Sequence, residues 1–296
     1  MIIGIDIGST TTKTVSVEDG VLVRKIKTRA QDAVTSAAGA FGKLLIENDI
    51  EITGVSGIAV TGAGASKLKN NLFGIPTQRV DEIKAIGTGG LFLAETYCAV
   101  KPRTDRIVIA NVGTGTAILQ AGKDGIAHLG GSGVGGGTIY GLAKKLLPTA
   151  DFSGIMELAK DGKLNQVDLL LEDITDTEIS FLPRESTAAN FGKMLDSALN
   201  SDIALGILNM VYQVIGMISV FAARSVGVDR VIVTGNGSNN PVGKQVLRII
   251  NEMYGIRFEY PPDAEYTTAV GAALSWRNQG GAERRSCSNA PSVNSA

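Results

Sequence analysis

A short polar run after the apolar N-terminal segment carries residue types suited to phosphate chemistry. Residues 2–7 (IIGIDI) predict a buried strand, which places Asp6 near its end. A carboxylate at that point could hold Mg²⁺ through water. The turn that follows supplies amides, hydroxyls and a cation for phosphate oxygens, at Gly8, Ser9, Thr10, Thr11 and Lys13. The alternative is an ordinary hairpin in which Asp6 caps a turn.

Glycine is concentrated in residues 111–142, in two clusters. Glycine permits tight turns and a close approach of the backbone to another group. The first cluster is the turn Gly113-Thr114-Gly115-Thr116, after an apolar strand at 106–111. The second runs into a helix-like segment, where N–H groups can surround a phosphate, and its candidate residues are Gly135, Gly136, Gly137 and Thr138. The alternative is a flexible surface loop.

One pattern, a strand, a turn of glycine and hydroxyl residues, and a second strand, occurs near residues 3–17 and again near 107–129. Two such turns that face each other could hold a nucleotide phosphate chain from both sides. A further strand, over 229–237, ends in Gly235-Asn236-Gly237 and is a weaker indication of a nucleotide-facing turn. This internal repeat is the main organising feature of the chain.

A carboxylate stands at a predicted strand-to-helix junction. A short strand precedes a helix that begins near Asp81, so Glu82 lies at the junction. A carboxylate there can point into a cleft and accept a proton from a hydroxyl group. The alternative is an acidic residue in the first turn of a helix, a position that the helix dipole favours.

Composition limits the classes of protein that the chain can be. The 296 residues are 44% hydrophobic and 19% charged, with a net charge of −1, as in one or two soluble domains. Near-neutral charge indicates no nucleic-acid or membrane partner. The two cysteines, Cys98 and Cys287, are too few for a disulfide framework and predict free thiols. Asp6 comes too early in the N-terminal segment for the apolar region of a signal peptide, and the apolar run 203–223 predicts a buried helix, so we expect a cytoplasmic protein.

The remaining pattern predicts alternating helices and strands in two domains. Helices are expected over 31–49, in the region 138–225 and, as one long apolar helix, over about 200–226. The domains are predicted at 1–105 and 106–278. Residues 279–296 have the composition of a disordered tail.

Several motifs in this order resemble the actin-like ATPase superfamily of sugar kinases, Hsp70 and actin. IDIGSTTTK is similar to its first phosphate motif, ANVGTGT to its second, and VTGNGSN to its adenosine motif. Type II pantothenate kinases are a closer match, through VDEIKAIGTGGL, GGSGVGGGTIYGL, DLLLEDI and STAANFGKML. The resemblance covers roughly residues 1–276. It implies an α/β fold of duplicated actin-like (ribonuclease H-like) domains with a cleft between them.

The resemblance also implies roles for individual residues. Glu82 matches the general base of the family, and Asp6 matches its metal site. The residues that match its phosphate loops are Gly8, Ser9, Thr10, Lys13, Gly113, Thr114 and Gly115. The residues that match its glycine loop are Gly135, Gly136, Gly137 and Thr138. Phe152 falls where the family often places an aromatic ring against adenine, and Gly235 and Asn236 fall in its adenosine loop. ATP and Mg²⁺ are the implied cofactors, and the long helix is expected at a homodimer interface.

Two positions depart from the family's pattern on the acceptor side. Where the family usually has a serine that touches pantothenate this chain has Ala117, and where it usually has an arginine for the substrate carboxylate this chain has His128. Each lost polar contact could cost about 1–3 kcal/mol of binding. Pantothenate is the expected acceptor, and pantetheine, which has no carboxylate, is an option.

Three other functions stay open at this point. One is an ATPase that activates a 2-hydroxyacyl-CoA dehydratase, although such activators hold an iron–sulfur cluster with two cysteines per chain, and Cys98 and Cys287 look unsuited to it. Another is a regulator that binds ATP without kinase activity; Glu82 argues against it, whereas Ala117 and His128 argue for it. The last is a kinase for an unrelated sugar or amine.

Overall fold

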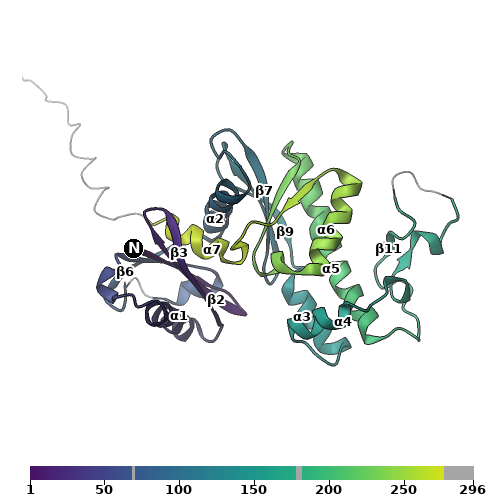
Figure 1. Cartoon of the computed structure of the whole chain (residues 1–296), viewed down its shortest axis with the longest axis horizontal. Coiled ribbons are helices and arrows are strands. Elements are labelled where there is room, and N and C mark those ends of the chain that lie inside the picture. The colour runs from purple at the N-terminus through teal and green to yellow at the C-terminus, as the bar shows by residue number, and fades with distance from the viewer. Residues whose placement is uncertain (69–70, 178–181, 277–296) are drawn as a thin grey trace, which may run out of the picture.

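The computed structural model describes residues 1–68, 71–177 and 182–276. The predicted tail lies outside these residues. Figure 1 shows two lobes side by side, each built on a β-sheet, with two helices between them. The α/β fold class predicted from the sequence is confirmed.

The first lobe is a six-stranded sheet in the order β3-β2-β1-β4-β6-β5. Its strands are β1 (Ile2–Ile7), β2 (Thr11–Glu18), β3 (Val21–Arg29), β4 (Gly57–Thr61), β5 (Asn71–Leu72) and β6 (Ile75–Arg79). Strands β1 and β2 are antiparallel, whereas β1 and β4 are parallel. Asp19 and Gly20 both have positive φ, of 48° and 80°, which suits the tight predicted turn between β2 and β3. Helix α1 (Ala33–Glu47) covers one face of this sheet.

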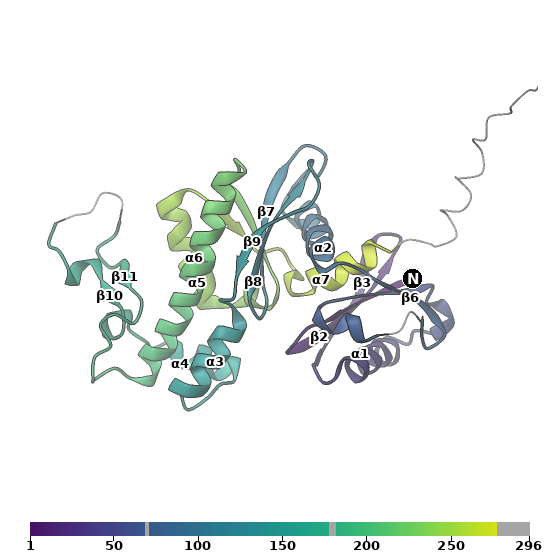
Figure 2. The ribbon, with the colours of Figure 1, turned by 180° about the vertical axis from the view of Figure 1, so that it is seen from behind.

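The second lobe repeats this topology. Its sheet has the order β13-β12-β7-β8-β9, which matches β6-β4-β1-β2-β3 of the first lobe strand for strand. The strands are β7 (Arg106–Val112), β8 (Thr116–Gly122), β9 (Ala127–Ser132), β12 (Arg230–Thr234) and β13 (Arg257–Glu259). One face of the sheet packs on helices, seen from behind in Figure 2, which are α3 (Gly136–Leu146), α4 (Phe152–Ala159), α5 (Asn200–Ser225) and α6 (Pro241–Tyr254). The internal repeat is therefore a duplicated fold.

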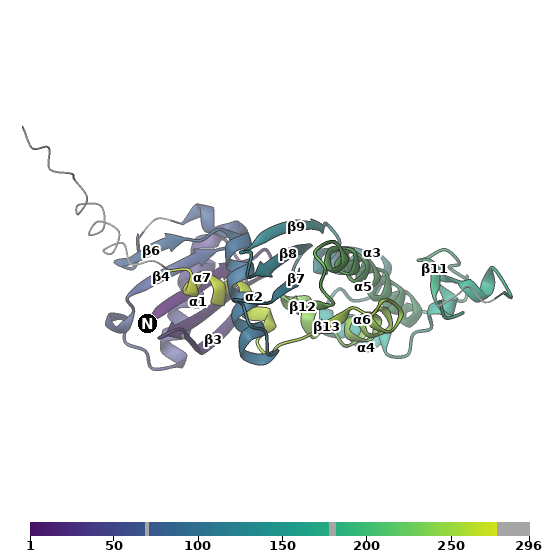
Figure 3. The ribbon, with the colours of Figure 1, turned by 90° about the horizontal axis from the view of Figure 1, so that it is seen from above.

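Each of the two helices between the lobes follows one sheet in the sequence and packs against the sheet of the other lobe. Helix α2 (Glu82–Tyr97) follows the first sheet, yet Ile86 and Ala94 pack with Ile107 and Leu119 of the second. Helix α7 (Thr267–Leu274) follows the second sheet and packs against β1 and β2 of the first. Figure 3 shows both helices lying between the sheets. The predicted division of the chain at residue 105 stays a prediction, and α7 is the element that returns across it.

Short elements fill the connections. They are the 3-10 turns Ile52–Gly54, Ala63–Lys67, Leu164–Gln166, Leu171–Asp173, Asn236–Asn239 and Ala264–Tyr266, and the strand pair β10 (Leu169–Leu170) and β11 (Thr187–Ala189). The fully buried carboxylate of Asp168 organises this strand pair. It accepts hydrogen bonds from Thr187 Oγ1 at 3.0 Å, Phe191 N at 2.9 Å and Asn209 Nδ2 at 2.9 Å. This polar stretch is thereby fixed to α5.

Helix α5 is the one helix of the described residues that is long and apolar enough to cross a membrane. Within its most apolar window, 61% of the residues are buried inside the protein. This is how the central helix of a folded lobe behaves, and it agrees with the buried helix predicted from the sequence.

Candidate nucleotide and catalytic site

Asp6 and Lys13 form the charged centre of the first turn. They are register partners on β1 and β2, and Lys13 Nζ lies 3.5 Å from Asp6 Oδ2. Both residues are 7% exposed. Burial raises the pKa of the Asp6 carboxyl, and the positive charge of Lys13 opposes this rise. The site therefore holds a desolvated carboxylate whose only adjacent cation, among the described ion pairs, is Lys13.

The first and second turns meet across the lobes. Ser9 Oγ and Thr114 Oγ1 are 2.6 Å apart, and either hydroxyl can donate the hydrogen bond. Within the second turn, Gly113 N donates to Gly115 O at 2.9 Å. The expectation that the two turns face each other is confirmed. Gly8 and Thr10 belong to the same first turn, between β1 and β2.

The glycine loop packs directly on the second turn. Gly136 N donates to Gly113 O at 2.9 Å, and Gly137 N donates to Thr114 O at 2.8 Å. A Cβ on Gly135 would lie 2.7 Å from Thr114 O, so only glycine permits this approach. The N–H groups of Gly136 and Gly137, which were expected to face a phosphate, are thus already paired with the second turn. The loop opens α3, as the sequence predicts, and its role toward a nucleotide stays a prediction.

Thr138 and Phe152 lie beside the glycine loop. Thr138 Oγ1 accepts from Gly135 N at 3.2 Å and donates to Gly133 O at 3.2 Å, which closes the start of α3. Phe152 is the first residue of α4, and its side chain is among the exposed large hydrophobic ones, at 42%. Its ring lies 3.6 Å from where a Cβ of Gly136 would be. An exposed aromatic ring against a glycine loop is a surface on which a flat ring can stack.

The predicted adenosine turn lies beside the first turn. Gly235 has a φ of +81° and directly follows β12. Asn236 Nδ2 donates to Thr11 Oγ1 at 3.2 Å, although the two residues are 225 positions apart in the sequence. The structure thus brings together all three turns that the sequence singled out.

Glu82 begins α2, and its carboxyl group interacts electrostatically with Asp6. The Asp81 side chain caps the helix, accepting a hydrogen bond from Lys84 N at 2.9 Å. Burial, and next the negative charges of Asp6 and Asp81, raise the pKa of the Glu82 carboxyl, while Lys13 lowers it. A raised pKa makes a carboxylate a better proton acceptor.

The two acceptor-side residues share one face of the second sheet. Ala117 packs against the core cluster that also includes Ile83 of α2. His128 is exposed and pairs in register with Leu119, a member of that cluster. Both predicted substrate residues therefore lie on the side of the sheet that faces α2, which carries Glu82 at its start.

Sequence reasoning missed Thr61 and Gly62. Gly62 has a φ of +85°, and a Cβ on it would lie 2.6 Å from Asp6 Oδ1. Thr61 is fully buried and pairs in register with Asp6. The signal was present, because the strand end VTG occurs both at 60–62 and at 233–235.

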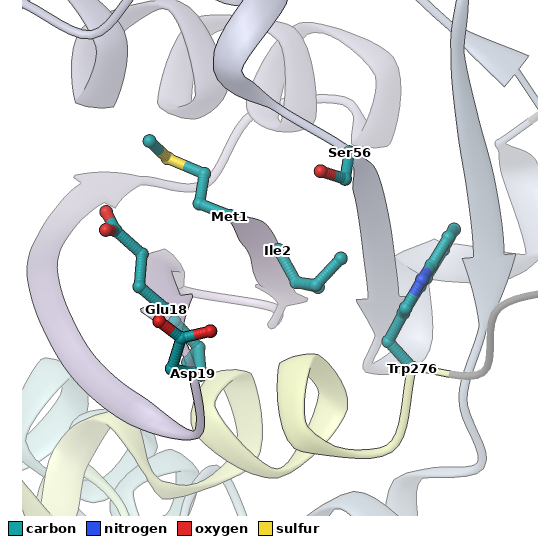
Figure 4. A pocket seen from close by; sticks show the side chains of 7 residues that line it. Met1, Ile2, Glu18, Asp19, Ser56 and Trp276 are labelled. Carbon is teal, nitrogen blue, oxygen red and sulfur yellow. The ribbon is translucent and has the colours of Figure 1, made fainter.

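A cavity of about 310 Å³ lies at the opposite end of the β1–β2 hairpin. Figure 4 shows its lining, which is made by Met1, Ile2, Val17, Glu18, Asp19, Ser56 and Trp276. None of the predicted site residues is among them, so the cavity is separate from the three turns.

Comparison with known proteins identifies the family. The sequence pattern of the Fumble family matches residues 23–255. The chain belongs to this family. A type II pantothenate kinase of Bacillus anthracis is 31% identical over 236 residues, covering 77% of this chain and 83% of that protein. One of Bacillus cereus is 29% identical over 286 residues, covering 94% of this chain and 98% of that protein. The resemblance seen in the motifs is confirmed.

Solved structures share the fold of this member of the Fumble family. An activator of 2-hydroxyisocaproyl-CoA dehydratase from Clostridium difficile, with bound ADPNP, superposes with a TM-score of 0.62 at 19% identity, covering 92% of each chain. A glucokinase of the ROK family from Streptomyces griseus, in complex with glucose and AMPPNP, gives 0.56 at 14% identity, covering 92% of this chain and 98% of that one. At these identities the likeness concerns the fold alone.

Proposed function

We propose that the protein transfers the γ-phosphoryl group of ATP to the primary hydroxyl of pantothenate or of a close relative such as pantetheine. The observation that carries this proposal is the cluster of Asp6, Lys13 and Glu82 beside two turns that meet through Ser9 and Thr114. Membership of the Fumble family and similarity to type II pantothenate kinases support it.

Each charged group has a distinct task in this reaction. The acceptor oxygen attacks the γ-phosphorus, the bond from the γ-phosphorus to the β,γ-bridging oxygen breaks, and ADP leaves. Glu82 takes the proton of the attacking hydroxyl, for which its raised pKa suits it. Lys13 places a positive charge where negative charge is spread over the transferring group. The hydroxyls of Ser9 and Thr114 hold the phosphate chain between the lobes.

The residues present suit Mg²⁺. Magnesium in phosphoryl-transfer sites is bound through one or two carboxylates, substrate phosphates and several waters. Asp6 is the buried carboxylate that would hold the ion, and a glycine at position 62 leaves room beside its Oδ1 atom. A bound Mg²⁺ ion would supply positive charge to offset the negative charge of the phosphates.

The residues on the acceptor side would decide the substrate. Ala117 offers no hydroxyl, and His128 offers an imidazole in place of a fixed bidentate cation. Pantothenate is the acceptor that its relatives' names indicate. Pantetheine lacks the carboxylate that an arginine would bind, so the absence of this arginine should weaken binding of pantetheine less than binding of pantothenate.

The deciding experiment is ADP release with Mg-ATP and no acceptor, pantothenate or pantetheine. We expect acceptor-dependent turnover that Glu82→Gln abolishes without loss of ATP binding. Turnover with pantetheine alone would keep the mechanism and change the substrate. ATP binding without turnover for either acceptor would refute the kinase proposal.

Activation of a dehydratase through an iron–sulfur cluster is less well supported. The thiolate is the form of cysteine that binds metal, and burial, followed by the nearby Glu259, raises the pKa of Cys98 to about 11. Cys287 lies outside the described residues. The dehydratase activators share the fold at 19% identity, whereas the more similar sequences are kinases.

We further propose that the protein is a homodimer, and the cytoplasmic location stays a prediction. Met210, Val214, Met217 and Phe221 recur at helical spacing on α5 and are half-buried or exposed, with Phe221 at 60%. A Phe221→Asp variant that stays dimeric in light scattering would contradict this assignment of the interface.

A further inference from the structure

The duplication places equivalent residues at the ends of equivalent strands. Asp6 of β1 pairs in register with Thr61 of β4, and Asn111 of β7 pairs in the same way with Thr234 of β12. A glycine with positive φ follows each threonine, at +85° and +81°, and a short 3-10 turn comes next. The Asp6–Thr61 pair is therefore the counterpart of the Asn111–Thr234 pair.

In the second lobe, the threonine hydroxyl forms a hydrogen bond within the pair. Thr234 Oγ1 donates a hydrogen bond to Asn111 Oδ1 at 3.0 Å, and Thr234 is fully buried. A buried hydroxyl is normally satisfied in this way, because an unpaired one costs free energy.

In the first lobe, the corresponding hydrogen bond is not formed. Thr61 is also fully buried, yet its Oγ1 has no hydrogen-bond partner among the described residues. Parallel strands in register place both side chains on one face of the sheet, so Thr61 lies beside the Asp6 carboxylate. Ala59, two residues earlier, packs with Ala85 of α2, so this face is the one near Glu82.

Other unpaired hydroxyls of this sheet have a different setting. They belong to alternate residues of β2 and are those of Thr12, Thr14 and Ser16. Their register partners include Ile3, Ile5 and Ile7, which pack in the core with α1, on the opposite face from Lys13. Thr61 alone among the four stands next to a candidate ligand-binding carboxylate.

We propose that the Thr61 hydroxyl is a binding group of the nucleotide site, left unpaired for an oxygen that Mg-ATP brings to Asp6. That oxygen belongs either to a water of the magnesium ion or to a phosphate, and in both cases Thr61 donates the hydrogen bond. This inference rests on the proposed ATP binding. It assigns Thr61 to positioning of the ligand and leaves proton transfer with Glu82.

The hydroxyl has opposite effects on the free and the bound protein. In the free protein it is a desolvated donor without a partner, so its removal costs no stability. In the complex it bonds to a charged or polarised oxygen, a contact that corresponds to about tenfold to hundredfold in affinity. A purely structural threonine would show the reverse, because its removal would lower the melting temperature.

The test measures the melting temperature without nucleotide and the Kd for ATP by calorimetry, with Mg²⁺ and with EDTA. Thr61→Val should keep or raise the melting temperature and weaken Mg-ATP binding at least tenfold, and Thr61→Ser should bind like the wild type. Thr14→Val, which also removes an unpaired buried hydroxyl, should leave the affinity unchanged. Thr234→Val should lower the melting temperature, because it breaks a formed hydrogen bond.

Each outcome decides between defined alternatives. Weaker binding of Thr61→Val only with Mg²⁺ assigns the contact to a water of the ion, and weaker binding in both buffers assigns it to a phosphate oxygen. Wild-type affinity in Thr61→Val, or a melting temperature that falls as in Thr234→Val, overturns the inference and leaves the kinase proposal intact. A wild-type protein that binds no ATP overturns both.

Discussion

The crossing of α2 and α7 gives a sharp prediction about how the lobes are joined. A Cβ on Gly271 would lie 1.8 Å from Ala85 O, and a Cβ on Gly89 would lie 1.9 Å from Thr267 O. Both obstacles are backbone atoms, which cannot rotate away. Because α2 packs on the second sheet and α7 on the first, Gly271→Ala must push the two lobes' helices apart.

The size of the effect follows from two opposing terms. Ordinary van der Waals contact begins at 3.4 Å, so the helices must separate by more than 1 Å. Overpacking of this kind costs about 1–3 kcal/mol or somewhat more, whereas exchange of a helical glycine for alanine gains at most about 1 kcal/mol. With the full gain of about 1 kcal/mol, the net loss is up to about 2 kcal/mol, which corresponds to a melting temperature lower by up to about 8 °C at about 2–4 °C per kcal/mol.

Gly39→Ala is the matched control, because it makes the same substitution in α1 with nothing within 4 Å of the new Cβ. Calorimetry should show a higher melting temperature for Gly39→Ala and a lower one for Gly271→Ala. The kinase assay should also show reduced turnover for Gly271→Ala, because α2 carries Glu82. Equal melting temperatures for the two variants would refute the argument that the crossing requires glycine.

Three further predictions concern the site. Turnover should fall as the pH is lowered through the raised pKa of Glu82, because the base must be ionised to accept a proton. The apparent pKa of this fall should lie above about 4.3, the ordinary value for glutamate. A turnover that stays constant down to that pH would contradict the role of Glu82 as the base. Phe152→Ala should weaken ATP binding about tenfold, and Phe152→Tyr should not, as measured by titration calorimetry. The double variant Ala117→Ser, His128→Arg should lower the KM for pantothenate while that for pantetheine changes less, and equal changes for both acceptors would argue against a carboxylate contact.

The sequence was sufficient for the turns because they are built from local patterns. Strand, glycine and hydroxyl residues follow one another in Asp6–Lys13 and again after residue 106, and tight turns of this kind are encoded locally. The position of Glu82 followed from the same logic, since Asp81 is a helix cap that can be read from the chain.

Contacts between distant segments were not readable in this way. The pairing of Gly136 N and Gly137 N with the second turn depends on how the glycine loop packs, and only the folded lobe shows it. The exchange of α2 and α7 depends on apolar faces that would suit either sheet. Thr61 has no distinguishing neighbour in the sequence apart from the repeated VTG, and its unpaired state is a tertiary property.

The two halves of the duplicated fold differ in charge, which bears on how ATP would lie in the proposed site. Asp6 pairs in register with Lys13 in the first lobe, whereas the equivalent pair in the second lobe is Asn111 with Ala117, which is neutral. Glu82 adds its charge on the side of Asp6, and the exposed ring of Phe152 lies with the second lobe. Phosphates and Mg²⁺ need charged partners, while adenine needs a flat apolar surface. If the protein binds ATP as proposed, the γ-phosphate would therefore face the first lobe and adenine the second, and the asymmetry between two equivalent halves would orient the nucleotide.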